Sequence, residues 1–570
     1  MPTIPQSRRV RNDATDWVKC PKCGRLQYTK RLVRSLGVCA ECGHHFRLTA
    51  RERIAQLADK NSFAECGNDI GSVDPLGFAD RRPYLERLAQ AADATGEREA
   101  VVFGTATVEG YRIVLAVMDF GFMGGSMGSA VGEAITRAAE TAHDIRCPLV
   151  LVCTSGGARM QEGVLALLQM VKTSQALARL HEAGVFSVCI LSDPTFGGVT
   201  ASFAMLGSIV IAESGALVGF AGPRVIEQTI RQKLPAGFQT SEFLLRHGLV
   251  DRVENRAELR SSLARLLALH APGSARTSAE VMQLSSVSEV AAVHPPSGDP
   301  WAVVQTARHI ERPTALDYLH DAFEEFVELH GDRGFADDPA IIGGVARIGG
   351  QPVVVVAHQK GHNTKELVAR NFGMPHPEGY RKVLRFLEHA ERFGMPVVTL
   401  VDTPGAYPGV EAEERGQAGV IAQVLVRLTR LRVPVVCVVT GEGGSGGALA
   451  LATGDRLLML ENSFFSVISP EGCAAILWRT TDAAPAAARA LRITAADLLQ
   501  LGITDSIIPE PQGGAHTDGL IAAANLRRGV LAALDELTAV DVPSLLTHRY
   551  ERFRQIGATT RIWQTQERSA

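Results

Sequence analysis

Short apolar runs alternate with amphipathic stretches over most of this chain. The runs predict buried strands, and the stretches carry the apolar spacing of helices. In the first half the predicted strands lie at 101–103, 113–117, 148–152 and 185–191, with a turn at 109–110 after the first. The predicted helices there lie at 129–143 and 165–183. Strands that alternate with helices indicate an α/β fold.

Glycine-rich turns follow several of the predicted strands. One is Ser155-Gly156-Gly157-Ala158, and another is Phe196-Gly197-Gly198. The richest, Gly441–Gly447, holds five glycines in seven residues between the apolar run 433–439 and a predicted helix start at Ala448. Such a turn exposes backbone N–H groups and lets a ligand approach the main chain. The stretch has no lysine and is not a P-loop, so an anion there would be held mainly by backbone N–H groups.

The same series of segments occurs twice. Four segments of the first half recur 248 residues later, as Pro148 recurs at Pro396. The pairs are 146–150 with 394–398, 155–158 with 403–406, 196–200 with 444–448, and 219–223 with 467–471. A fifth pair, 240–251 with 494–505, follows at nearly the same spacing. We expect two copies of one α/β fold; the alternative is two unrelated α/β domains that share glycine turns.

The regions outside the copies carry weaker patterns. Residues 271–299 are rich in small residues and proline, which predicts a linker. A helical entry is expected over 301–329, before the second copy begins near Ile341. The last stretch, 520–555, reads as charged helix without evident chemistry.

Two Cys-x-x-Cys pairs stand near the N-terminus. Cys20 and Cys23 are followed, after fifteen residues, by Cys39 and Cys42. This spacing is typical of a structural zinc ribbon with four thiolate ligands and no open position for catalysis. Gly24 and Gly43 follow the second cysteine of each pair, where the chain turns with positive φ. Two redox pairs or four unlinked thiols are the alternatives. The other cysteines are predicted to be buried small hydrophobes: Cys66, Cys147, Cys153, Cys189, Cys437 and Cys473.

The composition limits the number of domains and the class of protein but does not indicate a function. The chain has 570 residues, a net charge of −3 and 46% hydrophobic residues, which predicts two or more globular domains. No secretory signal or membrane-length apolar run is evident, so we expect a cytoplasmic protein. Residues 1–53 hold twelve Lys/Arg against four acids. This basic segment could meet a polyanion such as RNA or DNA, meet the phosphates of a nucleotide-like substrate, or remain a solvated face.

Each copy offers two glycine turns whose N–H groups could converge into an oxyanion hole. The candidate donors are Gly156, Gly157, Gly197 and Gly198 in the first copy, and Gly405, Ala406, Gly446 and Gly447 in the second. Two holes suit a reaction in which two carbonyl compounds each become enolate-like. The alternative for any single turn is structural, because glycine also lets a helix lie close to a strand.

No nucleophile or base stands out beside the turns. Ser155 and Ser445 lie next to glycines, but without a G-x-S-x-G elbow. His358 and His362 could form a base or metal pair, although ordinary polar or binding roles are favoured. The charged residues Glu411, Glu413, Glu414 and Arg415 are expected to cap or salt-bridge a helix.

Taken together, the motifs of this chain resemble those of bacterial acetyl-CoA carboxylase carboxyltransferase, with the β subunit fused ahead of the α subunit. The β-like motifs are the four cysteines, 118–120, 154–163 and 193–202. The α-like motifs are 316–318, 331–333, 358–361, 371–375, 402–409, 441–447 and 469–472. The resemblance covers about residues 16–275 and 299–550. It implies a zinc ribbon at 16–53, a crotonase-like β domain at 54–270, a linker at 271–299 and a crotonase-like α domain at 300–555.

The resemblance implies transfer of a carboxyl group from carboxybiotin, held on a biotin carboxyl carrier protein, to acetyl-CoA. The product would be malonyl-CoA, in the first step of fatty acid biosynthesis, and the resemblance also implies a holoenzyme with an ATP-dependent biotin carboxylase. Coenzyme A is expected mainly in the β-like half. Biotin is expected in the α-like half, at Gly405, Gly446 and Gly447. The missing base fits, because the ureido anion left by carboxybiotin can take the methyl proton.

Two departures from the family pattern are visible. One linker joins what are usually separate chains, so a homodimer of fused chains would replace the α₂β₂ assembly. The helical N-terminal part of the α subunit is cut down to 300–329. The alternative substrate is propionyl-CoA or another short acyl-CoA. The alternative enzyme is an acyl-CoA hydratase, isomerase or hydrolase. Nucleic-acid binding by the ribbon is a secondary hypothesis.

Overall fold

The computed structural model describes residues 17–74, 76–79, 81–223, 226, 234–271 and 299–556. The chain divides into two units, which are treated separately. Unit 1 comprises the chain through Ala271 together with Arg333–Phe335, and unit 2 comprises the remainder. The predicted linker, except for its ends at Ala271 and Asp299, lies outside the described residues, as do the basic residues Arg8, Arg9 and Arg11.

Unit 1 begins with the cysteine-containing segment and continues into one large sheet. The segment holds β1 (Trp17–Lys19), β2 (Leu26–Tyr28) and α1 (Thr29–Arg34). The sheet strands are β3 (Ala64–Cys66), β4 (Val101–Val108), β5 (Tyr111–Met118), β6 (Leu149–Ser155), β7 (Ser187–Phe196), β8 (Ile209–Glu213), β9 (Val218–Gly219) and β10 (Arg252–Glu254). The helices are α2 (Ala50–Leu57), α3 (Tyr84–Thr95), α4 (Ser129–Asp144), α5 (Gly163–Glu182), α7 (Ser241–Arg246) and α8 (Leu259–Leu269), with short 3₁₀ turns η1 (Met123–Gly125), η2 (Met160–Glu162) and η3 (Phe203–Met205).

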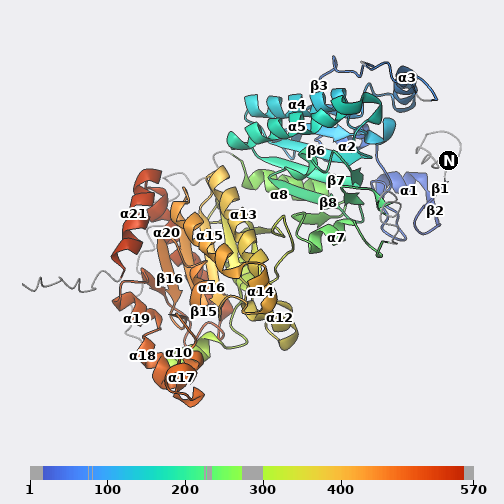
Figure 1. Ribbon diagram of the computed structural model, residues 1–570. Helices are drawn as coiled ribbons and strands as arrows, with labels where there is room; N and C mark the ends of the chain where they lie inside the picture. Colours follow the sequence, from blue (N-terminus) through green and yellow to red (C-terminus); the bar gives the residue numbers. More distant parts are fainter. Residues whose placement is uncertain are drawn as a thin grey trace, which may run out of the picture. The chain divides into compact units, whose positions relative to one another are not determined.

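The unit 1 sheet has the order β10-β8-β7-β6-β5-β4-β3, with β9 beside β7. The strands from β5 to β10 pair in parallel, while β3, β4 and β5 pair antiparallel. β6 is buried at every position, as expected of a central strand covered on both faces. Helices α4 and α5 lie side by side along one face (Figure 1). The core between α4 and the sheet is aliphatic and alanine-rich.

Unit 2 repeats this arrangement. Its strands are β11 (Glu325–Glu328), β12 (Ile341–Ile348), β13 (Gln351–His358), β14 (Val397–Thr403), β15 (Val435–Gly444), β16 (Arg456–Leu460), β17 (Phe464–Ser466) and β18 (Ser506–Ile508). Its helices are α10 (Pro300–Ala307), α11 (Ala315–Ala322), α12 (Thr364–Ala369), α13 (Pro377–Phe393), α14 (Val410–Glu414), α15 (Gln417–Arg430), α16 (Ser445–Leu449), α17 (Pro470–Leu477), α18 (Ala484–Leu491), α19 (Ala495–Gln500), α20 (Gly519–Thr538) and α21 (Val542–Gln555), with 3₁₀ turns η4 (Asn371–Gly373) and η5 (Thr481–Ala483).

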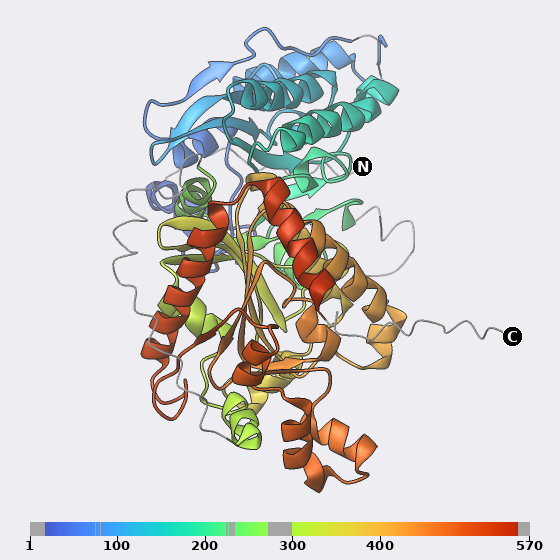
Figure 2. The same cartoon turned by 90° about the vertical axis from the view of Figure 1, so that its left-hand side faces the viewer.

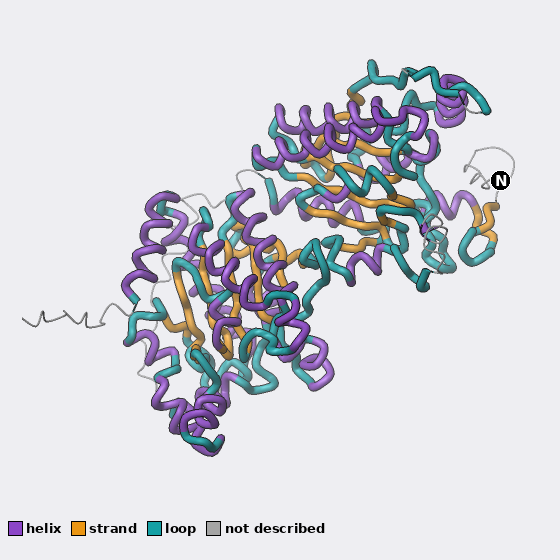
Figure 3. The backbone as a smooth tube through the Cα atoms, viewed as in Figure 1, coloured by secondary structure: helices purple, strands orange, loops and turns teal. Residues whose placement is uncertain are grey.

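The strand order of unit 2, β18-β16-β15-β14-β13-β12-β11 with β17 beside β15, matches that of unit 1 strand for strand. β14 and β15 begin and end 248 residues after β6 and β7, which confirms the predicted repeat. In each unit, helices lie on both faces of the strands (Figure 2, Figure 3). α13 and α15 pack together, and α20 contributes much of the core with β13 and β16.

Two expectations about local structure need correction. The entry over 301–329 is not continuous helix: after α10 and α11 it ends in β11, which pairs antiparallel with β12. The second copy therefore begins before Ile341. The glycines Gly441–Gly444 do not form a turn, because β15 continues through them and pairs with β17. The helix that follows, α16, has only five residues.

Candidate active site and zinc centre

The four ribbon cysteines converge. The Sγ atoms of Cys20 and Cys42 lie 3.7 Å apart, those of Cys23 and Cys39 lie 3.8 Å apart, and all four lie within 4.8 Å of one another. A tetrahedral zinc with Zn–S bonds of about 2.3 Å requires sulfur atoms about 3.8 Å apart. The donor set and its size thus fit one structural zinc ion.

The backbone of both knuckles supports that geometry. Gly24 donates its N–H to the carbonyl of Cys20 (2.9 Å), and Gly43 donates its N–H to the carbonyl of Cys39 (3.0 Å). The φ angles of Gly24 and Gly43 are +71° and +68°, as predicted from their place after the second cysteine. The two halves of the site are therefore built alike.

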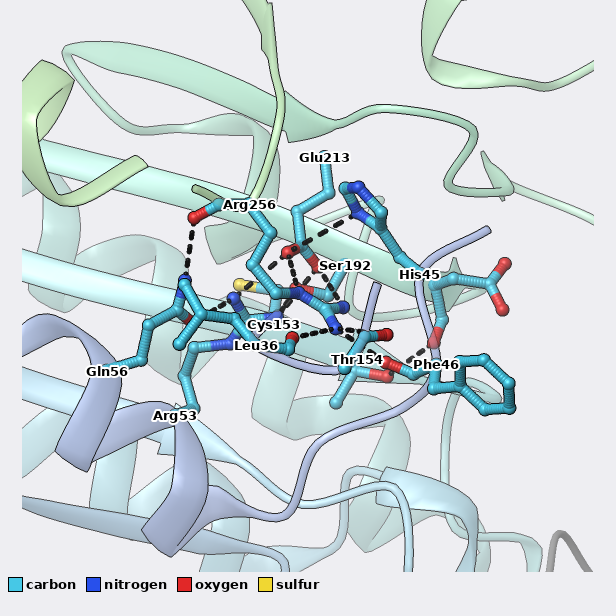
Figure 4. A network of polar contacts seen from close by, with 12 residues as sticks. Leu36, His45, Phe46, Arg53, Gln56, Cys153, Thr154, Ser192, Glu213 and Arg256 are labelled. Carbon is cyan, nitrogen blue, oxygen red and sulfur yellow. Dashed lines mark hydrogen bonds and ion pairs between the residues drawn. The ribbon is translucent and has the colours of Figure 1, made fainter. Parts of the chain in front are cut away.

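A buried ion-pair network, missed by the sequence reasoning, joins the ribbon to the sheet of unit 1 (Figure 4). Arg256, just after β10, pairs with Glu213 at the end of β8 (2.8 Å). It also donates to the carbonyls of Leu36 (3.0 Å) and Phe46 (2.8 Å) in the ribbon. Arg53 of α2 pairs with the other oxygen of Glu213 (2.7 Å). One carboxylate thus receives two guanidinium groups, one of which holds the ribbon in place.

The electrostatics of this network follow from burial and charge. Burial alone would raise the pKa of Glu213, but Arg53 and Arg256 hold that pKa well below its usual range. His45 Nδ1 lies 3.8 Å from Glu213. Burial, assisted by the positive charge of Arg256, lowers the pKa of His45 to about 4. The histidine is therefore neutral near pH 7. A cavity of about 20 Å³ beside the network has room for about one water molecule.

In unit 1 the two predicted glycine turns meet. A Cβ added at Gly197 would lie 2.9 Å from the Cα of Gly157, and one added at Gly157 would lie 4.0 Å from the nitrogen of Gly198. The first turn follows β6 and the second follows β7. Only glycine at position 197 allows this approach, and its φ of +65° also favours glycine.

Hydrogen bonds within the fold decide which N–H groups remain available in unit 1. Gly156 donates to the carbonyl of Gly124 (2.9 Å), Gly157 donates to Ser155 Oγ (3.0 Å), and Gly197 donates to the carbonyl of Phe220 (2.8 Å). Among the described residues, the N–H groups of Ala158 and Gly198 have no acceptor. The predicted turns are thus in place, and Ala158 and Gly198 each present an available N–H group.

Unit 2 has the same construction. Gly405 donates to Thr403 Oγ1 (3.1 Å), as Gly157 does to Ser155. A Cβ added at Gly447 would lie 2.2 Å from the nitrogen of Ala406, so the turn after β14 touches the start of α16. The N–H groups of Ala406 and Gly446 find no acceptor within the described part of the chain. A Cβ added at Gly446 would meet nothing within 4 Å, so space lies in front of this residue.

A charged cluster, also missed from sequence, stands behind the turns of unit 2. Lys360 Nζ lies 2.7 Å from Asp402 and 3.3 Å from Glu442, at the ends of β13, β14 and β15. Arg308 pairs with Glu442 and with Glu471, at 2.6 Å each. Burial alone would lower the pKa of Lys360, but the two carboxylates raise it above its usual value, so the ammonium stays charged.

The unit 1 counterparts of this cluster are uncharged. The positions that correspond to Lys360, Asp402 and Glu442 are occupied by Phe120, Thr154 and Pro194. The two sites therefore share their backbone and differ in the side chains behind it.

The side chains considered as nucleophiles or bases have other surroundings. Ser155 Oγ donates to the carbonyl of Gly125 (2.6 Å) and holds the turn. Ser445 begins α16 with a φ of +55°. His358 is buried with both ring nitrogens unpartnered, and burial lowers its pKa to about 3. His362 is exposed and hydrogen-bonded to Asp317 (2.8 Å). The two histidines do not form a metal-binding group within the described residues.

Of the remaining charged candidates, Arg415 forms a predicted salt bridge, whereas no side chain of the described residues caps α14 by a hydrogen bond. Glu411 and Glu413 occupy the first turn of α14, and Arg415 pairs with Glu378 of α13 (3.1 Å). Within the described ranges, no helix is both long enough and apolar enough to cross a membrane.

Comparison with known proteins agrees with this architecture. The family model for "acetyl co-enzyme A carboxylase carboxyltransferase-like" proteins matches residues 250–557, and that for the "acetyl-CoA carboxylase zinc finger domain" matches residues 17–42. Acetyl-coenzyme A carboxylase carboxyl transferase subunits beta/alpha of Saccharopolyspora erythraea is 54% identical over 556 residues, or 97% of each chain. The protein of the same name from Salinispora arenicola is 56% identical over 561 residues, or 98% of each chain.

Solved structures show the same fold. The crystal structure of the transcarboxylase 12S core is similar with a TM-score of 0.68 and 23% identity, and covers 90% of this chain and 92% of its own. A single-chain, multi-domain long-chain acyl-CoA carboxylase is similar with a TM-score of 0.65 and 23% identity, over 86% of this chain and 46% of its own.

The two sheets have the crotonase-like fold of the solved carboxyltransferases, and the full-length relatives identify the chain as a biotin-dependent carboxyltransferase. The chain belongs to the acetyl-CoA carboxylase carboxyltransferase family, in the form that joins the β and α subunit sequences in one polypeptide. Its reaction is the transfer of a carboxyl group from carboxybiotin to acetyl-CoA, and its ribbon binds structural zinc.

Proposed function

We propose that the free backbone donors of the two units hold the two reacting carbonyl compounds. In unit 1, the N–H groups of Ala158 and Gly198 would bind the thioester oxygen of the acyl-CoA. In unit 2, those of Ala406 and Gly446 would bind the ureido oxygen of biotin. One observation carries this proposal: in each unit the turn after one central strand meets the residues that follow the next strand, and at each of these two places an N–H at an equivalent position has no acceptor among the described residues.

The other predicted residues then serve the shape of the turns. Within unit 1, internal hydrogen bonds are donated by the N–H groups of Gly156, Gly157 and Gly197, and within unit 2 by the N–H group of Gly405. Gly447 allows the close approach to Ala406. Mutation of the first four residues should alter the geometry of the holes rather than delete a donor, and mutation of Gly447 should push the start of α16 away from Ala406.

The transfer needs no protein base under this proposal. The C–N bond of carboxybiotin breaks and releases CO₂, the ureido nitrogen takes a proton from the acetyl methyl group, and the enolate carbon bonds to CO₂. Biotin and malonyl-CoA result, so atoms and charge balance. The chain contributes position and two oxyanion holes, each preorganised in backbone that has no need to move.

An exposed apolar stripe supports assembly into a homodimer of fused chains. Val164, Leu167, Leu168 and Val171 lie on one face of α5, and each is more than half exposed. Contiguous apolar surface of this kind marks a protein interface. Light scattering after gel filtration tests the stripe: Leu168→Glu should convert the dimer to a monomer, and an unchanged mass would contradict this assignment.

The partners and boundaries follow the family. We propose the biotin carboxyl carrier protein and biotin carboxylase as partners, the cytoplasm as the location, and domains at 16–53, 54–270 and 300–555 joined by 271–299. Propionyl-CoA is the alternative acyl substrate to be compared with acetyl-CoA. The comparisons give no support to a nucleic-acid partner for the ribbon.

A coupled assay tests the function directly. Purified chain would be combined with biotin carboxylase, biotinylated carrier, ATP, bicarbonate and either acetyl-CoA or propionyl-CoA. Malonyl-CoA should be the main product, with a higher kcat/KM for acetyl-CoA. Failure to carboxylate any short acyl-CoA would overturn the proposal, and turnover of crotonyl-CoA without biotin would favour the hydratase alternative.

A further inference from the structure

Three consecutive residues with left-handed backbone precede the first long helix behind each site. Along 123–125 of unit 1 the φ angles are +47°, +69° and +63°, and along 371–373 of unit 2 they are +48°, +56° and +76°. Each triplet ends four residues before its helix, α4 or α13. The two triplets are therefore corresponding parts of the repeated fold.

The middle residue of the triplet differs sharply between the units. Unit 1 has Gly124, which adopts a positive φ at no steric cost. Unit 2 has Phe372, and a bulky residue with positive φ is a strained outlier. Core packing does not explain the aromatic ring, because 45% of Phe372 is exposed. Strain of this kind persists where a function requires it.

The triplet of unit 2 lies against the ends of the strands that carry the site. A Cβ added at Gly373 would lie 2.9 Å from Cγ of Lys360 and 3.0 Å from the carbonyl oxygen of Asp402. Asp402 is three residues before Gly405. Just after the triplet, the carbonyl of Pro375 accepts the N–H of Tyr407 (2.9 Å). The residues directly after Phe372 thus contact the strand end and the turn that present Ala406.

A second difference occurs at the same contact. In unit 1 the N–H of Gly156 donates to the carbonyl of Gly124, which ties the triplet to the turn. The position of Gly156 is taken in unit 2 by Pro404, which has no N–H. The corresponding hydrogen bond to Phe372 cannot form. A phenyl ring and a pyrrolidine ring stand where unit 1 has two glycines, so unit 2 carries more apolar side-chain surface at this contact.

We propose that Phe372 is a positioning residue for biotin, and that its ring forms the apolar wall against which the fused rings of biotin lie. The inference rests on the proposed assignment of biotin to unit 2. Biotin has an uncharged bicyclic body with an apolar face and one strongly polar ureido edge. A ligand of this kind is held by an aromatic side chain on its face and by a few polar groups at its edge. The N–H groups of Ala406 and Gly446 supply the polar groups.

The test uses the reverse reaction, in which malonyl-CoA and free biocytin give acetyl-CoA and carboxybiocytin. Wild type would be compared with Phe372→Ala, Phe372→Gly and Phe372→Trp. Alanine and glycine should raise KM for biocytin about tenfold and change KM for malonyl-CoA less than twofold. Tryptophan should keep both values near wild type. Tyr550→Ala, which removes an exposed aromatic ring from α21, is the matched control and should change neither.

The glycine variant separates positioning from structure. Because glycine relieves the strain at position 372, Phe372→Gly should raise Tm by about 2 °C while it impairs biocytin use. Unchanged kinetics in the alanine and glycine variants would overturn the inference, and so would an equal rise in KM for malonyl-CoA. A variant whose only defect is a lower molecular mass in light scattering would assign the ring to an interface and also overturn it. Failure of the proposed function would show separately, as absence of carboxyl transfer in wild type.

Discussion

Units 1 and 2 bring a turn after one central strand against the end of the next, and both fix that turn in the same way. Ser155 and Thr403 accept the N–H two residues further on, in unit 1 and unit 2 respectively. Behind the turn, however, unit 1 has Phe120, Thr154 and Pro194, whereas unit 2 has Lys360, Asp402 and Glu442.

This difference separates two tasks of the site. The free N–H groups recur at equivalent positions, although the side chains around them have diverged in size and charge. A hole made of backbone tolerates such divergence, because its donors do not depend on residue identity. Selection between two carbonyl compounds must then reside in the side chains that differ.

The largest expected effect comes from filling the space in front of Gly446. Gly446→Val should fold, since a Cβ there meets nothing within 4 Å, but its side chain would occupy the proposed unit 2 hole. Loss of one oxyanion donor costs roughly 10²–10³ in kcat. We expect a loss of about that size in the exchange with biocytin, measured by steady-state kinetics, with malonyl-CoA binding retained in calorimetry.

The matched variant in unit 1 is Gly198→Val. A Cβ at Gly198 would lie 3.3 Å from the flexible ends of Met127 and Met170, which can give way. Its defect should fall on acyl-CoA binding instead. If both variants impair both substrates equally, the assignment of one substrate to each unit fails.

Removing the Lys360 ammonium of unit 2 should have the next largest effect, a loss of stability. Lys360→Met leaves Asp402 and Glu442 without their ammonium partner, although Arg308 still pairs with Glu442. Breaking a buried ion pair from one side costs about 3 kcal/mol. Hydrogen exchange of β13 and β14 should show this loss. Adding Asp402→Thr, which copies Thr154 of unit 1, should restore part of it; a loss below about 1 kcal/mol in the single variant would contradict the prediction.

A smaller effect is expected from His358→Met, which copies Met118 of unit 1. The pKa of His358 is lowered to about 3 by burial, below its unfolded value of about 6.5. The unfolded chain therefore binds more protons between these two pH values. The unfolding free energy is unaffected by this histidine's titration above pH 6.5, and it decreases as the pH falls from 6.5 towards 3.

This linkage has a measurable size. Between pH 8 and pH 5, wild-type unit 2 should lose about 2 kcal/mol of unfolding free energy through this residue. His358→Met should remove that part of the pH dependence and gain about 1 kcal/mol at pH 8, because two unpartnered buried nitrogens disappear. Denaturant unfolding at both pH values is the measurement, and parallel pH profiles for variant and wild type would refute the linkage.

The smallest effect is expected at Ser445. Its φ of +55° matches the +65° of Gly197, the corresponding residue of unit 1. Ser445→Gly should relieve the strain and stabilise unit 2 by about 0.5–1 kcal/mol. For a domain of this size, that gain in unfolding free energy corresponds to a rise in Tm of about one or two degrees. Destabilisation would show that the hydroxyl contributes more than the backbone strain costs.

The sequence predicted the repeated fold and the zinc site because both depend on local spacing. Two Cys-x-x-Cys pairs fix four ligands without knowledge of the rest of the chain, and apolar runs fix strands such as β6 and β14. It did not reveal which N–H groups stay free. That depends on Gly124, whose carbonyl engages Gly156 from a turn about thirty residues away.

The misjudged elements have the same origin. The segment Glu325–Glu328 contains too few apolar residues to be recognised as a strand, and it forms one because β12 offers it an edge. Gly441–Gly444 resembles a turn by composition, yet its pairing with β17 keeps it extended. The network of Arg53, Glu213 and Arg256 joins segments too far apart for any motif to indicate.

The attachment of the ribbon through Arg256 has a consequence for the order of folding. The donor in Arg256 and its acceptor in Leu36 are 220 residues apart. At synthesis rates of about 5–20 residues per second, the ribbon leaves the ribosome roughly 10–40 seconds before the arginine that fastens it. Zinc can close the knuckles during that interval, but the ribbon cannot dock until β10 is complete. Docking of the ribbon thus reports that the last strand of the unit 1 sheet has been made.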